Sequence, residues 1–159
     1  MRFMVAAALT CVAGLLAPSQ AAGQALKAED AIAQTLSVYA TAWNNADGKA
    51  IAELYTLDAD DAVIGAVARG RAQIEKRYTQ LLTETFRGTQ MTMAMSSLRF
   101  VNPSTAIVDG SFELSGASLP GGVGNQVKRL FIAIIVNDND QWRVTALWSA
   151  ATSPADPTH

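Results

Sequence analysis

The stretch YATAWNNAD at residues 39–47 decides the fold of this chain. Tyr39 and Trp43 continue an apolar series that starts at Ile32 and recurs every three or four residues, which predicts one amphipathic helix. The polar residues after Trp43 end this helix, and Asp47 is a suitable N-cap for a second, short helix. We expect the second helix to carry three apolar or aromatic residues, Ile51, Leu54 and Tyr55.

The stretch GRAQI at residues 70–74 opens a third predicted helix. Its apolar and aromatic residues again share one face: Ile74, Tyr78, Leu81, Leu82 and Phe86. Between the second and third helices, the acidic run at residues 58–61 predicts a turn, and residues 62–64 predict a short strand.

After Gly88 the apolar residues recur at every second position, which is typical of strands. We expect four strands, at residues 91–100, 105–114, 127–136 and 142–148. The third is apolar on both faces, which predicts a central position, and the last lies in and after the stretch QWRV at residues 141–144. Two turns and one Gly- and Pro-rich loop separate the strands, at residues 102–104, 138–140 and 116–124. Helices followed by an antiparallel meander predict an α+β fold.

The N-terminus has the pattern of a secretory signal peptide. Arg2 supplies the positive charge, residues 3–16 are mostly apolar, and small residues precede the first charged cluster at Lys27. Cleavage is expected after Ala21 or Ala25, and an uncleaved N-terminal anchor is the alternative. We therefore expect a signal peptide at 1–25, one folded domain at 26–150, and a disordered tail at 151–159. The mature protein is expected to be periplasmic or secreted and to have no membrane span.

Composition limits the chemistry that the mature chain can perform. Half of the 159 residues are hydrophobic and 16% are charged, which indicates a folded domain. Removing residues 1–25 takes away one arginine and no acid, so the net charge changes from −2 to −3, and no nucleic-acid partner is expected. The only cysteine is Cys11 and the only histidine is His159, so carboxylates, tyrosines, arginines and lysines are the remaining reactive groups. The acidic run at 58–61 lacks the glycine and glutamate of a calcium loop, and we expect neither a metal nor a cofactor.

The order of several short motifs resembles the nuclear transport factor 2-like (NTF2-like) superfamily. The motifs are Tyr39-x3-Trp43-Asn44, Asp47, Leu54-Tyr55, Gly70-Arg71-x2-Ile74 and Trp142-Arg143-Val144. Within the superfamily the chain is most similar to the SnoaL-like and DUF4440 branches, especially the SgcJ/EcaC family, from about residue 30 to residue 149. The resemblance implies a cone-shaped barrel, in which N-terminal helices pack on a curved, mostly antiparallel sheet and close a pocket. Members often dimerise through the sheet, and they include isomerases, cyclases, dehydratases and non-catalytic binding modules.

One enzymatic branch can be compared residue by residue. Ketosteroid isomerases use a tyrosine of the first helix and two aspartates, one as base and one as hydrogen-bond donor to the oxyanion. Tyr39 falls at the tyrosine position, but the base aligns near Val63 and the second acid near Phe131 or Ile132. Because two of the three roles are missing, isomerase activity is not expected.

Three polar residues are candidates for catalysis: Tyr39, Asp61 and Arg129. Tyr39 either serves a pocket or bonds a backbone carbonyl inside the core. Asp61 shares a strand face with Val63 and either points inward or belongs to a solvated turn. Arg129 shares a face with Phe131, and an inward arginine would be costly unless it is paired. The sequence leaves its direction open.

Five further residues are candidates for lining a ligand pocket: Trp43, Tyr55, Met93, Phe112 and Trp148. The alternating methionines at 91, 93 and 95 either contact a flat apolar ligand or belong to the core or a dimer interface. Arg71, at the start of the third helix, is expected to form an ion pair with one of three acids, Asp47, Asp58 or Glu75.

Two functions follow from these candidates. The first is an exported protein that binds a hydrophobic small molecule, either without reaction or as an enzyme that acts on it by acid/base chemistry. The second is a non-catalytic, homodimeric module that binds a ligand or another protein.

Overall fold

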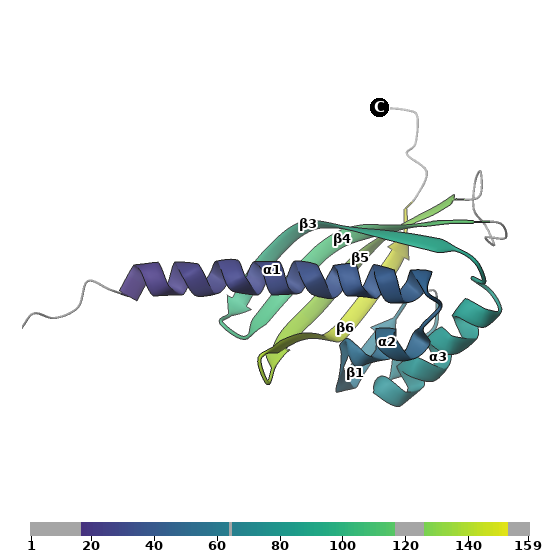
Figure 1. Cartoon of the computed structure of the whole chain (residues 1–159), viewed down its shortest axis with the longest axis horizontal. Coiled ribbons are helices and arrows are strands. Elements are labelled where there is room, and N and C mark those ends of the chain that lie inside the picture. The colour runs from purple at the N-terminus through teal and green to yellow at the C-terminus, as the bar shows by residue number, and fades with distance from the viewer. Residues whose placement is uncertain (1–16, 64, 117–125, 153–159) are drawn as a thin grey trace, which may run out of the picture.

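Six strands form one sheet, and three helices lie along its concave side (Figure 1). The computed structural model describes residues 17–63, 65–116 and 126–152. The helices are α1 (Ala17–Asn44), α2 (Gly48–Glu53) and α3 (Arg71–Thr83). The strands are β1 (Tyr55–Ala62), β2 (Ala68–Arg69), β3 (Gln90–Asn102), β4 (Thr105–Ser115), β5 (Gln126–Asp138) and β6 (Gln141–Ala151).

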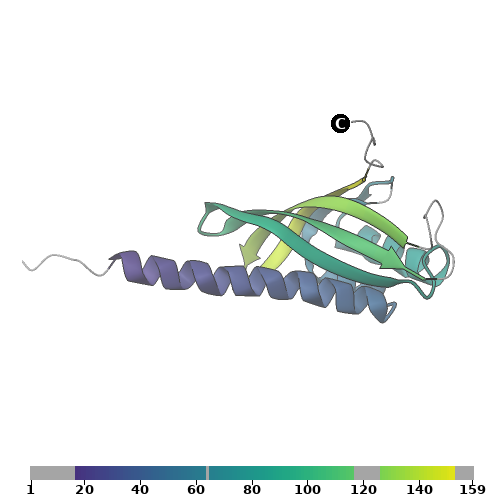
Figure 2. The same ribbon diagram turned by 90° about the horizontal axis from the view of Figure 1, so that it is seen from above.

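The strand order is β2-β1-β6-β5-β4-β3, and only the β1–β6 pair is parallel. The long strands β3 to β6 form an antiparallel meander that curls around α1 (Figure 2). Register shifts between Met95 and Ser97 and between Ile134 and Ile135 add local bends, as β-bulges do. These features confirm the expected α+β fold, with helices packed on a curved, mostly antiparallel sheet.

The predicted helical stripe is confirmed as the buried face of α1. Ile32, Leu36, Tyr39 and Trp43 are each at most 7% exposed and belong to one core with the inner faces of the strands. The N-terminal turns of α1 project beyond the sheet (Figure 1), and the expected cleavage positions lie in these turns. No helix among the described residues is long and apolar enough to cross a membrane.

The helix boundaries at Asp47 and Gly70 are also confirmed. The Asp47 carboxylate accepts a hydrogen bond from the Ala50 N–H at 2.8 Å, and Gly70 is the N-cap of α3, with a φ of 77° that favours glycine. Phe86 lies beyond the end of α3 rather than on its face, and it packs on Trp43 with ring centroids 5.6 Å apart.

The turn predicted at residues 58–61 is wrong. These residues belong to β1, which begins at Tyr55, so Tyr55 is a strand residue and not part of the second helix. The strand forms because it pairs with β6 and β2 on its two sides. The predicted loop at 116–124 and the predicted tail at 151–159 lie almost entirely outside the described residues.

The expected ion pair of Arg71 is replaced by a different contact. Its Nε donates a hydrogen bond to the Tyr55 carbonyl at 3.0 Å, and its Nη2 also points to that oxygen. No ion pair of Arg71 with Asp47, Asp58 or Glu75 occurs among the described residues. The arginine thus joins the start of α3 to the start of β1.

Candidate functional site

A buried carboxylate, Asp61, lies within a group of three tyrosines. The Tyr55 and Tyr78 hydroxyls donate hydrogen bonds to Asp61 Oδ2 at 2.5 and 2.9 Å. The Tyr39 hydroxyl donates to the Tyr78 oxygen at 2.5 Å. Asp61, Tyr55 and Tyr78 are fully buried, and Tyr39 is 4% exposed. We call these four residues the tyrosine–aspartate cluster.

Three elements bring the cluster together. Tyr39 comes from the buried face of α1, Tyr78 from the buried face of α3, and Tyr55 and Asp61 from β1. The Tyr39 ring meets the Tyr78 ring edge to face, with centroids 6.0 Å apart, and lies 6.5 Å from the Tyr55 ring.

The second carboxylate oxygen of Asp61 faces donors as well. Asp61 Oδ1 accepts the Val63 N–H at 3.3 Å and lies 3.5 Å from Nη1 of Arg77. The Arg77 guanidinium also donates to the backbone carbonyls of Asp61, Val63 and Ala66. Among the described residues, each hydrogen-bond partner of the Asp61 carboxyl is a donor, which matches the acceptor-only, ionised form of an aspartate.

Burial sets the ionisation of the cluster. It raises the pKa of Asp61 above the usual aspartate value, while the Tyr55 and Tyr78 hydroxyls and the Arg77 charge oppose that rise. Burial also raises the pKa of each tyrosine, so the hydroxyls remain protonated donors at neutral pH. A carboxylate held by phenol donors in a dry site is able to accept a proton, and Tyr78 and Tyr39 form a hydrogen-bonded path from it.

The structure brings together two of the three predicted catalytic residues, Tyr39 and Asp61, and adds the predicted pocket residue Tyr55. Arg129 lies elsewhere: it is half-buried on the inner face of β5, where its Nε donates to the Ser149 hydroxyl at 3.3 Å. Sequence reasoning missed Tyr78 and Arg77, since Tyr78 reads as an apolar-face residue of α3. A tyrosine on such a face is the available signal, because its buried hydroxyl needs a partner.

The remaining predicted pocket residues occupy three environments. Trp43 and Phe112 are core residues, and Trp43 donates its ring N–H to the Thr89 hydroxyl at 3.1 Å. Met93 lines a surface groove. Trp148 is 45% exposed on the outer face of the sheet beside Ile132, because the irregularity in β6 before Leu147 reverses which residues face inward.

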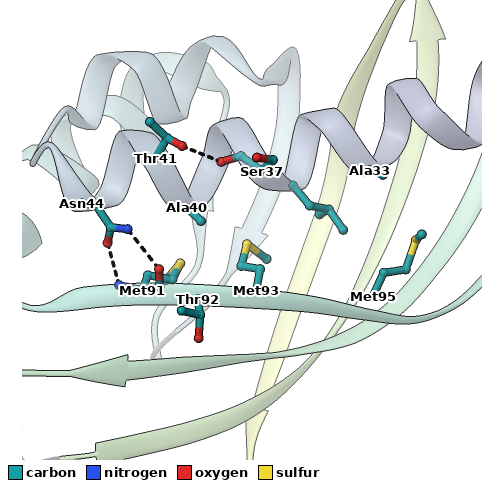
Figure 3. Close-up of a pocket in the computed structure, with 10 residues that line it drawn as sticks. Ala33, Ser37, Ala40, Thr41, Asn44, Met91, Thr92, Met93 and Met95 are labelled. Carbon is teal, nitrogen blue, oxygen red and sulfur yellow. Dashed lines mark hydrogen bonds between the residues drawn. The ribbon is translucent and has the colours of Figure 1, made fainter.

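The groove that contains Met93 runs between α1 and the edge strand β3 (Figure 3). It has a volume of about 410 Å³. The helix contributes Ala33, Leu36, Ser37, Ala40, Thr41 and Asn44, and the strand contributes Met91, Thr92, Met93 and Met95. We call this feature the α1–β3 groove.

Two further hollows are present among the described residues. One, of about 450 Å³, lies on the outer face of the sheet around Leu130, Ile132 and Trp148. The other, of about 840 Å³, lies between the N-terminal part of α1 and the aromatic pair Phe100–Trp142.

Comparisons with solved structures identify the architecture. An NTF-2-like protein of unknown function from Shewanella oneidensis superposes with a TM-score of 0.65 at 18% identity, covering 76% of this chain and 97% of that one. The chain has the NTF2-like fold. A candidate scytalone dehydratase from Novosphingobium aromaticivorans shares the NTF2-like fold with a TM-score of 0.72 at 17% identity, covering 83% of this chain and 89% of that one. A hexachlorocyclohexane dehydrochlorinase, LinA type 2, gives 0.73 at 15% identity, covering 87% and 95%.

These identities are low, so the comparisons establish the NTF2-like fold and leave the activity open. The sequence matches no model of a known protein family and no curated protein.

Proposed function

We propose that this chain is an exported NTF2-like protein of the SgcJ/EcaC type that binds a hydrophobic small molecule in the α1–β3 groove. The groove itself carries the proposal, because its volume falls within the range of small-molecule sites. Methionine side chains form one wall, and thioethers adapt to irregular apolar ligands. Ser37, Thr41 and Asn44 supply polar groups at its margin.

The other two hollows fit this role less well. The largest is walled partly by Gln24 and Ala25, which the expected signal-peptide cleavage after Ala25 would remove. The hollow on the outer face lies on a sheet surface with three exposed large apolar residues, which better suits contact with another protein.

Filling the groove is expected to prevent binding. Ser37→Leu places a larger side chain at the margin of the groove, and we expect at least tenfold weaker binding of the hydrophobic dye anilinonaphthalene sulfonate, measured by fluorescence titration. Gln34→Leu adds the same side chain to α1 outside the groove and is expected to bind the dye like the wild type. Equal affinity of wild type and Ser37→Leu would contradict the assignment of the site.

For the outer face we propose a homodimer. Leu130, Ile132 and Trp148 are 52%, 49% and 45% exposed and line one apolar hollow. We expect Leu130→Glu to convert a dimer into a monomer in analytical ultracentrifugation, since a charge would be buried in the interface. Val67→Glu, at an equally exposed apolar residue elsewhere, is the control. A wild-type monomer, or a dimeric Leu130→Glu variant, would refute the arrangement.

Acid/base catalysis is the second candidate, and the raised pKa of Asp61 within the tyrosine–aspartate cluster favours it. One structure with the same fold is a hexachlorocyclohexane dehydrochlorinase. In this chain Asp61 would accept the proton, and the Tyr55 and Tyr78 hydroxyls that donate to its carboxylate would hold it in place.

This candidate can be tested with a generic substrate. Nitrobenzisoxazole opens when a base removes its C3 proton and the N–O bond breaks, giving a coloured cyanonitrophenolate. We expect the wild type to accelerate this reaction and Asp61→Asn to abolish the acceleration, while Asp60→Asn, at a half-exposed neighbour, retains it. The same rate in wild type and Asp61→Asn would exclude Asp61 as the base.

A further inference from the structure

An asparagine side chain already shows how an amide binds beside this groove. Asn44 pairs with both backbone groups of Met91: its Oδ1 accepts the Met91 N–H at 2.6 Å, and its Nδ2 donates to the Met91 carbonyl at 3.1 Å (Figure 3). The N–H and C=O of Met91 therefore point away from β4, off the edge of the sheet and toward α1. The carboxamide takes the place that a neighbouring strand would have at this edge.

The same backbone orientation recurs at Met93. The strand β3 pairs with β4 in regular register from Gln90 to Met95, and backbone groups along an antiparallel strand alternate in direction. Two residues after Met91, the N–H and C=O of Met93 thus also point toward α1, and they do so within the groove. No hydrogen bond joins Met93 to a helix residue in the part of the chain that is described.

The helix offers no carboxamide at this second position. The groove follows α1 from Asn44 back to Ala33 while it follows β3 from Met91 forward to Met95, so helix and strand run in opposite directions (Figure 3). Four helix residues rise about 6.0 Å and two strand residues about 6.7 Å, so the residue four before Asn44 lies opposite Met93. That residue is Ala40, whose methyl group leaves both backbone groups of Met93 accessible from the groove.

We infer that the α1–β3 groove binds an apolar small molecule through a carboxamide that pairs with the backbone of Met93. This inference rests on the proposed function of the groove and specifies its ligand class. The carboxamide of the ligand would accept the Met93 N–H and donate to the Met93 carbonyl, as the Asn44 side chain does at Met91. The apolar body of the ligand would lie against Leu36 and Met95. An extended peptide fits less well, because Asn44 already occupies the adjacent backbone pair at Met91.

Two matched probes separate the inference from the proposed function. Naphthaleneacetamide carries an amide donor and acceptor, whereas methyl naphthaleneacetate has the same apolar body without an N–H. We expect the amide to bind up to about tenfold more tightly, because the ester keeps the carbonyl acceptor and loses only the hydrogen bond that the N–H donates, and we expect the amide to shift the Met93 amide resonance in a ¹H–¹⁵N spectrum. If both probes bind the groove equally, the groove is a ligand site and the amide inference is wrong. If neither binds, the proposed function fails as well.

A variant supplies an internal test. Ala40→Asn provides the missing carboxamide from the helix, so we expect it to slow hydrogen exchange at the Met93 amide and to abolish the tenfold preference for the amide probe. Gln34→Asn introduces the same residue on α1 outside the groove and is expected to leave both properties unchanged. An Ala40→Asn variant that keeps the amide preference, or that leaves Met93 exchange unaltered, would overturn the inference.

Discussion

Asp61→Leu is expected to lower the free energy of unfolding by about 4 kcal/mol, because the substitution removes the acceptor of several buried donors. The Tyr55 and Tyr78 hydroxyls and the Val63 N–H all donate to this carboxylate, and Arg77 pairs with it. Asp61→Asn retains one acceptor oxygen, and we expect about half of that loss. Urea denaturation followed by fluorescence measures both values.

Two controls identify the cause of this loss. Asp60→Asn, next in the chain, removes only an exposed contact to Arg69 at 3.6 Å, so its effect should remain below about 1 kcal/mol. In the Asp61→Leu background, Tyr55→Phe should cost almost nothing, since the Tyr55 hydroxyl has already lost its acceptor. Strictly additive effects of Asp61→Leu and Tyr55→Phe would mean that the hydrogen bond between Asp61 and Tyr55 contributes nothing.

The helices were predictable because their signals are local. The apolar stripe from Ile32 to Trp43, the cap at Asp47 and the glycine before α3 each act within one or two turns of chain. The alternation in β3 to β6 is equally local, and it placed the four long strands to within a few residues. The order of these signals predicted the α+β fold class, but it predicted neither the full strand β1 nor its parallel pairing with β6.

The candidate site depends on contacts that the local sequence does not encode. An acidic run such as residues 58–61 is normally solvated. Here the run forms β1 because it pairs with β6 and β2, and because Asp61 meets donors from α3 and from its own strand. Strand alternation correctly placed Arg129 on the face of Phe131, but it gave no partner for either residue. Trp148 illustrates the same limit, since one irregularity in β6 moved it to the outer face.

Arg77→Met should destabilise the fold strongly, and the loss should depend on pH. Arg77 is the cation beside Asp61, with a side chain that is only 15% exposed, and it also bonds the carbonyls of Asp61, Val63 and Ala66. Removing one partner of a buried pair costs about 3–5 kcal/mol, and we expect the lower end because this guanidinium retains some solvent contact.

The pH dependence follows from the direction of the Asp61 pKa. Burial raises this pKa in the folded state, so the folded protein holds the proton more tightly than the unfolded chain does. The part of the stability that comes from this tighter proton binding by Asp61 is thus fully present below the unfolded pKa and is lost as the pH rises through the folded pKa. Without the positive charge of Arg77, which lowers the pKa, the folded value rises further and the loss extends to higher pH.

We therefore expect the difference in unfolding free energy between wild type and Arg77→Met to be largest at pH 7 and to shrink toward pH 4, as Asp61 becomes protonated. Denaturation curves of both proteins across this range measure the difference. Arg69→Met, which removes the exposed arginine paired with Asp60, should show a small loss at every pH. If the Arg77→Met deficit is the same at pH 4 and pH 7, Asp61 and Arg77 are not electrostatically coupled, and Arg77 acts only through its bonds to the backbone carbonyls.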